Sequence, residues 1–395
     1  MPIREVKLGD ICTIKGGYAF KSGEFTKSGI PVVKIANIVG REIDFNEDSS
    51  FLSPANLEQY KEYIVNKGDI LVALSGATTG KFGIYKLDEI ALLNQRVAKI
   101  VPKNEQVCSK YLFYYMYKLQ NKILQKAGGA AQPNISPKEI AQFTIPLPSI
   151  DIQNRISEIL DKAQELIDKR KAQIEALDQL IQSVFLEMFG DPATNPKKWP
   201  MGFIKDLTLK TQYGTSKKAS EDAGKYPILR MNNITYEGHW DLTDLKYVDL
   251  DEKEVEKYLV HKGELLFNRT NSKELVGKTA VYRFEKPMAF AGYLVKVIPN
   301  EKANAEFISA YLNSKYGKSI LFSMAKNIVG MANINAEELK SIKIYIPPKQ
   351  LQDQFARIVQ KIESQRELFK KGLVELEKNF DSLMQRAFKG ELFSD

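Results

Sequence analysis

The sequence predicts an α+β fold with two tandem mixed α/β domains, separated by two long helices that pair as an antiparallel coiled coil. Two observations support this prediction. Four segments of the first half recur in the same order about 200 residues later, and each half ends in a stretch of about 40 residues with helical apolar spacing. A period this long excludes a solenoid and indicates a duplicated domain, that is, a pseudo-two-fold internal repeat.

The repeat is clearest in the segment YIVNKGDIL (63–71), which matches YLVHKGELL (258–266) with five identities in nine positions. The offset between matching segments drifts only from 195 to 199, as small changes in loop length would produce. The other matching pairs are IPVVKIANI (30–38) with YPILRMNNI (226–234), GKFGIYKL (80–87) with GKTAVYRF (277–284), and NISPKEI (134–140) with NINAEEL (333–339).

Each half begins with short apolar segments separated by glycine, proline and asparagine, a pattern that predicts strands. The predicted strands are 30–38, 69–74 and 96–101 in the first half, and 226–231, 264–267 and 293–298 in the second. Apolar residues at helical spacing predict helices over 111–125 and 306–322.

Each half ends in a predicted helix of roughly 60 Å. Residues 150–189 contain neither glycine nor proline, and their apolar positions shift register near Lys169; residues 350–388 repeat the design, with Gly372 as a weak point. Such stripes favour pairing of the two helices, and two separate helical hairpin arms are the alternative. The expected stripes are Ile152, Ile156, Ile159, Ala163, Leu166, Ile167, Ile174, Leu177, Ile181, Val184 and Met188, and then Leu351, Phe355, Ile358, Ile362, Phe369, Leu376, Phe380, Leu383 and Ala387.

A linker with three prolines, Pro192, Pro196 and Pro200, ends the first long helix. The expected boundaries are therefore a first mixed domain over 1–148, a long helix over 149–190, a linker over 191–202, a second mixed domain over 203–347, and a second long helix with the C-terminal tail over 348–395.

The charge of the chain is concentrated in the mixed domains. The 395 residues carry a net charge of +8, whereas the two long helices carry −3 and +1, which leaves +10 for the remainder. This distribution favours binding of a polyanion by the mixed domains. Lysines that only solvate the surface are the alternative.

Cysteine and histidine are too scarce for a metal site or a disulfide framework. Cys12 and Cys108 are the two cysteines, and His239 and His261 are the two histidines. No apolar run approaches the roughly 18 residues of a membrane span, and the first ten residues are charged where a signal peptide is apolar. We expect a soluble, cytoplasmic protein that binds no metal.

No complete catalytic motif is present in the sequence. Asn195-Pro196 lacks the second proline and the aromatic residue of an adenine-methyltransferase loop. Gly277-Lys278-Thr279 supplies only the end of a phosphate-binding loop, and no G-x-S-x-G elbow occurs. We therefore expect a chain without catalysis of its own.

Polar side chains of the kind that read bases cluster after the predicted strands. Arginine and lysine suit guanine, and asparagine and glutamine suit adenine, in the major groove. The loops that hold these residues differ between the halves while the strands agree, as expected for two related folds that read different sequences. The candidate DNA-binding residues are Lys34, Asn37, Ser75, Thr78, Thr79, Lys81, Asn94, Gln95, Arg96, Gln132 and Asn134 in the first half, and Lys217, Lys218, Arg230, Asn232, Asn233, Asn268, Arg269, Asn271, Lys273, Lys278 and Asn333 in the second.

Over its whole length the chain resembles the specificity subunits of type I restriction–modification systems. Beside the repeated 63–71 and 258–266 segments, the resemblance rests on GGAAQPNIS (128–136) with VGMANIN (329–335), on IPLPSIDIQNRISEIL (145–160) with IYIPPKQLQDQFARIV (344–359), and on FGDPATNPKKWP (189–200). The second domain has MANIN where the first has AAQPNIS, so a role of Gln132 does not transfer to it.

The resemblance implies that each mixed domain is a target recognition domain for one half of a bipartite, asymmetric site in double-stranded DNA. It also implies that the helices set the separation of the half-sites and dock two methylation subunits. This chain would bind no cofactor, and S-adenosylmethionine, ATP and Mg²⁺ are expected on the methylation and restriction/translocation subunits. A non-catalytic coiled-coil adaptor and a stand-alone DNA-modifying enzyme are the alternatives. The charge of +10 on the mixed domains disfavours the first, and the missing motifs disfavour the second.

Overall fold

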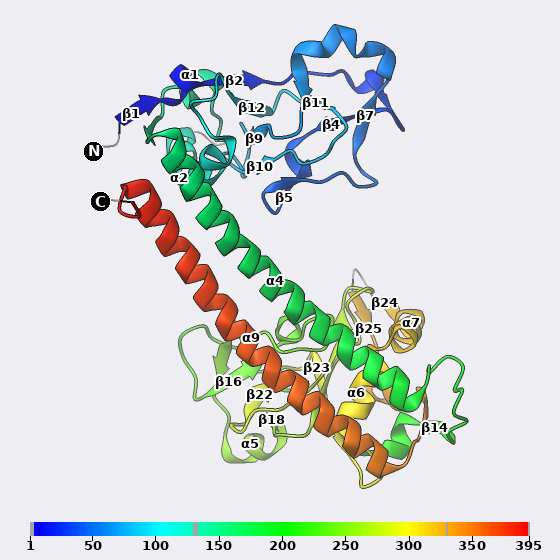
Figure 1. The fold of residues 1–395 in the computed structure, drawn as a ribbon. Coiled ribbons are helices and arrows are strands. Elements are labelled where there is room, and N and C mark those ends of the chain that lie inside the picture. The colour runs from blue at the N-terminus through cyan, green and yellow to red at the C-terminus, as the bar shows by residue number, and fades with distance from the viewer. Residues whose placement is uncertain (1–3, 129–132, 329–330, 394–395) are drawn as a thin grey trace. The chain divides into compact units, whose positions relative to one another are not determined.

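A computed structural model describes residues 4–128, 133–328 and 331–393 of the chain (Figure 1). The chain divides into two compact units, of which the first contains residues 1–169 and 373–395 and the second residues 170–372. Within the described ranges, no helix has the length and apolar character that crossing a membrane requires.

The first unit contains two larger mixed sheets and a strand pair. In hydrogen-bonded order, one sheet consists of β2 (Cys12–Gly16), β12 (Val97–Pro102), β9 (Ile70–Ala73), β10 (Phe82–Ile84), β6 (Glu42–Ile43) and β5 (Ile38–Val39). The other consists of β3 (Phe25–Thr26), β7 (Ser50–Leu52), β4 (Ile30–Val33), β11 (Ala91–Leu93) and β8 (Ile64–Val65), and β1 (Arg4–Lys7) pairs with β13 (Thr144–Leu147). The helices before the first long helix are α1 (Leu8–Ile11), α2 (Ser109–Ala127) and α3 (Pro137–Ile140).

The second unit repeats this topology. The order β2-β12-β9-β10 recurs as β15 (Thr208–Tyr213), β23 (Leu294–Pro299), β19 (Leu265–Asn268) and β21 (Thr279–Val281). The order β7-β4-β11-β8 recurs as β17 (Lys246–Val248), β16 (Tyr226–Leu229), β22 (Met288–Phe290) and β18 (Leu259–Val260), and β14 (Met201–Phe203) pairs with β26 (Lys343–Tyr345). The β4/β11 pair of the first unit is parallel, and so is the equivalent β16/β22 pair of the second. The predicted duplication is therefore confirmed at the level of strand order.

The remaining elements of the second unit are a three-stranded sheet and short helices. The sheet consists of β20 (Thr270–Asn271), β25 (Met331–Asn333) and β24 (Lys326–Ile328). The helices are α5 (Glu252–Tyr258), α6 (Ala305–Asn313), α7 (Lys315–Met324) and α8 (Ala336–Lys340).

Two predicted strands are shorter than expected, because each ends in a capped 3-10 turn. In the first unit the side-chain oxygen of Asn37 accepts a hydrogen bond from the backbone N–H of Lys34 at 2.9 Å. In the second unit Asn233 accepts from the backbone N–H of Arg230 at 2.8 Å. The predicted strands at 30–38 and 226–231 therefore stop at β4 and β16.

The helix predicted over 306–322 is divided into α6 and α7 at Ser314. Ser314 has an extended backbone, and its hydroxyl accepts a hydrogen bond from the backbone N–H of Gly317 at 3.1 Å. A serine that caps a new helix gives the chain a favourable alternative to continuing the old one. The helix predicted over 111–125 is continuous as α2.

The two long helices are confirmed as α4 (Ile150–Phe189) and α9 (Lys349–Lys389). In the first unit, Leu160 of α4 lies in one hydrophobic core with Phe380 of α9. In the second unit, Phe189 of α4 packs on Phe355 of α9, with ring centroids 5.4 Å apart. Each unit thus joins the beginning of one helix to the end of the other, so the paired segments are antiparallel.

The paired helices are also part of the core of each mixed domain. The ring centroid of Phe380 lies 6.2 Å from that of Tyr114 in α2, and the centroid of Phe189 lies 4.9 Å from that of Phe307 in α6. The apolar stripe of each long helix contacts the mixed domain as well as the partner helix. The buried positions therefore differ from the predicted ones. Leu166 is 54% exposed, although the predicted stripe contains it.

The helix α9 continues through Gly372 without a break. A Cβ atom at this position would collide with the guanidinium of Arg170. Arg170 lies over the ring of Phe369, 4.9 Å from its centroid. The glycine therefore makes room for a cation between the paired helices of the second unit.

A buried glutamine near the beginning of each long helix attaches that helix to its domain. Gln153 accepts a hydrogen bond from the backbone N–H of Cys108 at 2.9 Å and donates to two carbonyl groups. Gln352 accepts from the backbone N–H of Asn304 at 2.9 Å and also donates to two carbonyl groups. The duplication therefore extends to the internal hydrogen bonds.

Candidate nucleic-acid interface

Three loops of the first mixed domain are joined side by side by backbone hydrogen bonds. The N–H of Leu74 donates to the carbonyl of Arg96 at 2.9 Å, and the N–H of Ile135 donates to the carbonyl of Leu74 at 2.9 Å. Ser75 also forms a β-bridge with Asn134. We call the surface formed by residues 75–78, 95–96 and 134 the first polar face.

Several predicted DNA-binding residues meet on the first polar face. Thr78, Gln95, Arg96 and Asn134 are exposed there, and Ser75 is half-buried. Gln132 lies outside the described residues. Tyr18 was not predicted from the sequence. Its carbonyl accepts a hydrogen bond from the N–H of Gln95 at 3.0 Å, and its ring is partly exposed.

The second mixed domain repeats the same backbone frame with different side chains. The N–H of Arg269 donates to the carbonyl of Tyr293 at 3.0 Å, and the N–H of Ile334 donates to the carbonyl of Arg269 at 2.9 Å. Thr270 is opposite Asn333 in the β20/β25 pair. Arg269 and Tyr293 of the second domain thus take the places of Leu74 and Arg96 in the first.

The surface formed by Tyr213, residues 269–273, Tyr293 and Asn333 is the second polar face. It brings together the predicted residues Arg269, Asn271, Lys273 and Asn333. The Nζ atom of Lys273 lies 4.5 Å from the ring centroid of Phe322, whose side chain is exposed. Tyr213 and Tyr293 were not predicted, because aromatic residues in and beside strands are more often core residues. Their exposure follows from their position at the ends of β15 and β23.

Other predicted residues are buried, where their side chains serve the fold. Asn37 and Asn233 cap 3-10 turns, as described above. The hydroxyl of Thr79 donates to the carbonyl of Gly76 at 2.7 Å. Asn94 is buried, and Asn268 is fully buried and donates to the carbonyl of Met231 at 3.3 Å. We therefore exclude these five residues from the candidate interface.

Several predicted cations are also engaged within the protein. Arg230 and Asn232 both donate to the carboxylate of Asp244, at 2.8 and 3.2 Å. Lys217 forms an ion pair with Glu254. Lys278 is only 6% exposed, and burial lowers the pKa of its ammonium group. Lys217, Lys278 and Arg230 are therefore less available to a phosphate than the sequence suggested.

Three further predicted lysines, Lys34, Lys81 and Lys218, are not among the residues that define the two polar faces. The Nζ atom of Lys34 donates to the hydroxyl of Ser50 at 2.6 Å and lies 4.5 Å from the ring centroid of Phe25. Lys81 is half-buried, and Lys218 is exposed.

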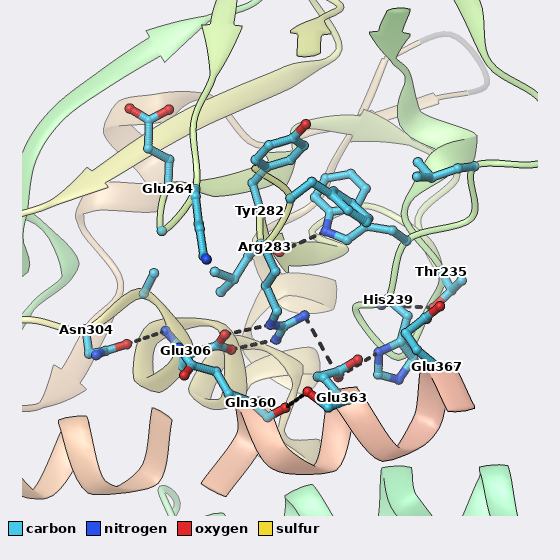
Figure 2. A pocket seen from close by; sticks show the side chains of 18 of the residues that line it. Thr235, His239, Glu264, Tyr282, Arg283, Asn304, Glu306, Gln360, Glu363 and Glu367 are labelled. Atoms are coloured by element: carbon cyan, nitrogen blue, oxygen red, sulfur yellow. Dashed lines mark hydrogen bonds and ion pairs between the residues drawn. The ribbon is translucent and has the colours of Figure 1, made fainter. Parts of the chain in front are cut away.

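A cavity of about 1200 Å³ in the second unit lies between the second mixed domain and α9. Figure 2 shows Arg283 at its centre, with Glu306 of α6 on one side and Glu363 of α9 on the other. Arg283 donates to both carboxylate oxygens of Glu306 at 2.6 Å, a bidentate pair, and its Nη1 atom lies 3.9 Å from Glu363.

The same network continues from Glu363 into both long helices. Arg366, only 1% exposed, donates to Glu363 at 2.7 Å and also pairs with Asp178 of α4. Burial alone would raise the pKa of Glu363, but the hydrogen bond to His239 and the charges of Arg283 and Arg366 lower it to about 2. Arg283, Glu306, Glu363, Arg366 and Asp178 are therefore paired with one another, and they attach the second domain to the helices.

The described residues hold no group of three or more acidic, cysteine or histidine side chains arranged to bind a metal ion. Burial raises the pKa of the Cys12 thiol to about 12, so this cysteine is not a nucleophile at neutral pH. Asn195, at the incomplete methyltransferase motif, both donates to and accepts from the backbone of Trp199, at 2.8 and 3.0 Å. That motif is part of a turn.

Comparisons with known proteins place this arrangement among DNA-recognition proteins. The sequence model of the family described as "Type I restriction modification DNA specificity domain" matches residues 2–177 and again residues 196–378. The EcoKI specificity subunit of Escherichia coli (strain K12) is 25% identical over 389 residues, which cover 92% of this chain and 82% of the relative. The MjaVIII specificity subunit of Methanocaldococcus jannaschii is 35% identical over 193 residues, 46% of this chain and 44% of the relative.

Two solved structures share the fold. The S subunit of a type I restriction–modification system from M. genitalium has a TM-score of 0.56 at 16% identity, covering 98% of this chain and 96% of its own. A chain from a structural study of complex assembly and conformational transition of the type I system has a TM-score of 0.56 at 15% identity, with 99% of each chain covered.

Proposed function

The chain belongs to the type I restriction–modification DNA specificity family, and from this premise we propose that its two polar faces each read one half of a bipartite, asymmetric DNA site. The observation that supports this proposal is the shared backbone frame of the two faces. The backbone hydrogen bond between Leu74 and Arg96 in the first domain is repeated by the one between Arg269 and Tyr293 in the second. The backbone positions are therefore equivalent, whereas the side chains differ. Two similar frames with different side chains suit two different half-sites.

Bases and phosphates would be contacted by different residues. Gln95, Arg96 and Asn134 of the first face, and Arg269, Asn271 and Asn333 of the second, have the donors and acceptors that read base edges in the major groove. Lys81, Lys218 and Lys273 would contribute phosphate contacts, which provide affinity without sequence preference.

In this proposal the paired helices set the separation of the two half-sites and dock two methylation subunits. The chain itself binds DNA and carries no catalysis. S-adenosylmethionine would be bound by the methylation subunits, and ATP and Mg²⁺ by the restriction and translocation subunits.

A domain exchange tests the two-reader proposal. Residues 1–148 are replaced by the corresponding domain of another family member, and the chimera is expressed with the methylation subunits. Sequencing of the methylated bases in host DNA gives the recognised motif. We expect one half of the motif to change and the other to be retained. A change in both halves, from a chimera that still supports methylation, would refute the proposal.

A further inference from the structure

Resting on the two-reader function above, we propose that Tyr213 and Asn333 hold the guanidinium of Arg269 as a preformed fork that reads one guanine in the second half-site. Arg269 would make the base contact. Tyr213 and Asn333 would be positioning residues, which act on the base only through Arg269.

The guanidinium of Arg269 packs on an aromatic ring but is poorly supplied with hydrogen-bond acceptors. It lies over the ring of Tyr213, 5.0 Å from the centroid. Its Nη1 atom is 3.5 Å from the carbonyl oxygen of Gly292, and its Nη2 atom is 3.4 Å from the side-chain oxygen of Asn333. Both distances are beyond the usual range for an N–H···O hydrogen bond, and the buried Nε atom has no partner in the described structure.

Other arginines of the second unit show what a structural arginine looks like in this protein. Arg230, Arg283 and Arg366 each donate to a carboxylate at 2.6–2.8 Å. Among the described residues, no carboxylate forms such an ion pair with Arg269. A cation that is ordered by a ring and two distant acceptors, without an anionic partner, keeps its strongest hydrogen bonds for an external acceptor.

The groups that surround Arg269 are themselves held in place. The hydroxyl of Tyr213 accepts a hydrogen bond from the backbone N–H of Ala336, the first residue of α8, at 3.0 Å. Tyr213 also belongs to β15, where it is opposite Val295 of β23. The amide nitrogen of Asn333 donates to the hydroxyl of Thr270 at 2.9 Å, which turns the amide oxygen toward Arg269. These contacts limit the rotamers of the fork before DNA arrives, which reduces the entropy lost on binding.

The geometry of the fork selects a guanine. A guanidinium presents two parallel N–H donors, and guanine offers two acceptors, O6 and N7, at matching spacing on its major-groove edge. A thymine offers one acceptor and a methyl group, and adenine replaces one acceptor with a donor. Lysine also contacts guanine, but as a point charge without the planar, parallel donors of this fork.

Among the described residues of the first domain, no arginine takes the place of Arg269. Leu74 holds the equivalent place in the first polar face, as the shared backbone hydrogen bonds show. Substitution of Arg269 should therefore act on one position of one half-site, and the other half-site is an internal control in the same molecule.

The test uses the full chain, expressed with its methylation subunits, with sequencing of the methylated motif in host DNA. The variants are Arg269→Ala, Arg269→Gln, Tyr213→Ala and Tyr213→Phe. Tyr236→Ala is the matched control, because Lys318 lies over the exposed ring of Tyr236, 4.4 Å from its centroid, outside the second polar face.

We expect both Arg269 variants and Tyr213→Ala to lose about ten- to a hundred-fold of the preference for guanine at one position of the second half-site. Tyr213→Phe keeps the ring and should keep most of the preference, and Tyr236→Ala should leave the motif unchanged. If the Arg269→Ala chain no longer assembles with the methylation subunits, Arg269→Gln tests the guanine contact instead, because it preserves much of the side-chain length.

Equal weakening of methylation at all sites would make Arg269 a phosphate contact and overturn the proposal. So would a second half-site that contains no guanine. A motif that stays unchanged in Tyr213→Ala would remove the positioning role of Tyr213. Loss of sequence preference in both half-sites would instead refute the two-reader function itself.

Discussion

The Nε2 atom of His239 lies 2.8 Å from the Oδ1 atom of Asp178, and this contact joins a loop of the second mixed domain to α4. His239 also faces Glu363 of α9, with 3.5 Å between Nδ1 and Oε1, and contacts the guanidinium of Arg366. In the first unit, the place in α4 that corresponds to Arg366 is held by buried Ile167. At this position of the long helices the contact is therefore apolar in the first unit and ionic in the second.

The attachment of the second domain should weaken as the pH rises above neutrality. Burial and the charge of Arg366 lower the pKa of His239, but hydrogen bonds to Asp178 and Glu363 outweigh them and raise it above its ordinary value of 6.5. A raised pKa in the folded state contributes stability that is fully present below about pH 6.5 and is lost as the pH rises through the folded-state pKa. Thermal unfolding between pH 5.5 and 9, followed by tryptophan fluorescence, measures this loss because Trp199 and Trp240, the two tryptophans, both lie in the second unit.

His239→Gln should remove most of the pH dependence in this range, and His261→Gln should preserve it. Nuclear magnetic resonance gives a direct test, because the His261→Gln variant keeps a single imidazole signal, that of His239. This signal should titrate with a midpoint above pH 6.5. A midpoint at or below pH 6.5 would refute the predicted linkage.

Substitution of Arg366 should destabilise the second unit strongly. Arg366→Met leaves Asp178 and Glu363 without their shared cation, and breaking a buried ion pair from one side costs about 3–5 kcal/mol. Urea unfolding followed by tryptophan fluorescence measures this cost. Arg357→Ala, at an exposed position of the same helix, is the control and should change the free energy of unfolding by less than about 0.5 kcal/mol. A similar small effect for Arg366→Met would show that the network adds nothing to stability.

The long helices and the duplication could be predicted because their signals are local and extended. An uninterrupted apolar spacing of 40 residues has few alternatives to a helix, and α4 covers the predicted residues 150–189. The ends of β4 and β16 could not be predicted in the same way. An asparagine side chain can read adenine and can equally cap a turn. Only the tertiary structure shows that Asn37 and Asn233 cap turns.

Only part of the candidate site could be predicted, because here too the role of a polar side chain depends on tertiary contacts. Gln95 and Arg269 follow strands β11 and β19, and Asn333 ends β25; the structure places all three on the polar faces. The partners that fix them come from distant segments, as Asn333 lies 64 residues from Arg269. The burial of Arg366 could not be predicted either, because its partners Asp178 and His239 lie 188 and 127 residues away in the sequence.

Gly17 should be intolerant of a side chain. A Cβ atom there would collide with the carbonyl oxygens of Leu93 and Asn94, which are backbone atoms and cannot move aside. Gly17→Ala should therefore cost more than about 1 kcal/mol and displace the neighbouring Tyr18, which lies beside Gln95 of the first polar face. Circular dichroism melting measures the cost. The control is Gly23→Ala, where nothing lies within 4 Å of the added atom, and an equal melting temperature for the two variants would contradict the prediction.

The last prediction concerns the proposed role of the helices in setting the half-site spacing. Both helices pass from one unit to the other, α4 between Lys169 and Arg170 and α9 between Gly372 and Leu373. Seven residues inserted at both places keep the apolar stripe in phase and lengthen each helix by roughly 10 Å, which corresponds to about three base pairs at ~3.4 Å per base pair. The methylated motif should then keep its two half-sites and gain about three base pairs between them. Insertion into α4 alone should abolish methylation, because antiparallel partners must lengthen together. A double insertion that remains active at the original spacing would show that the helices do not set the distance.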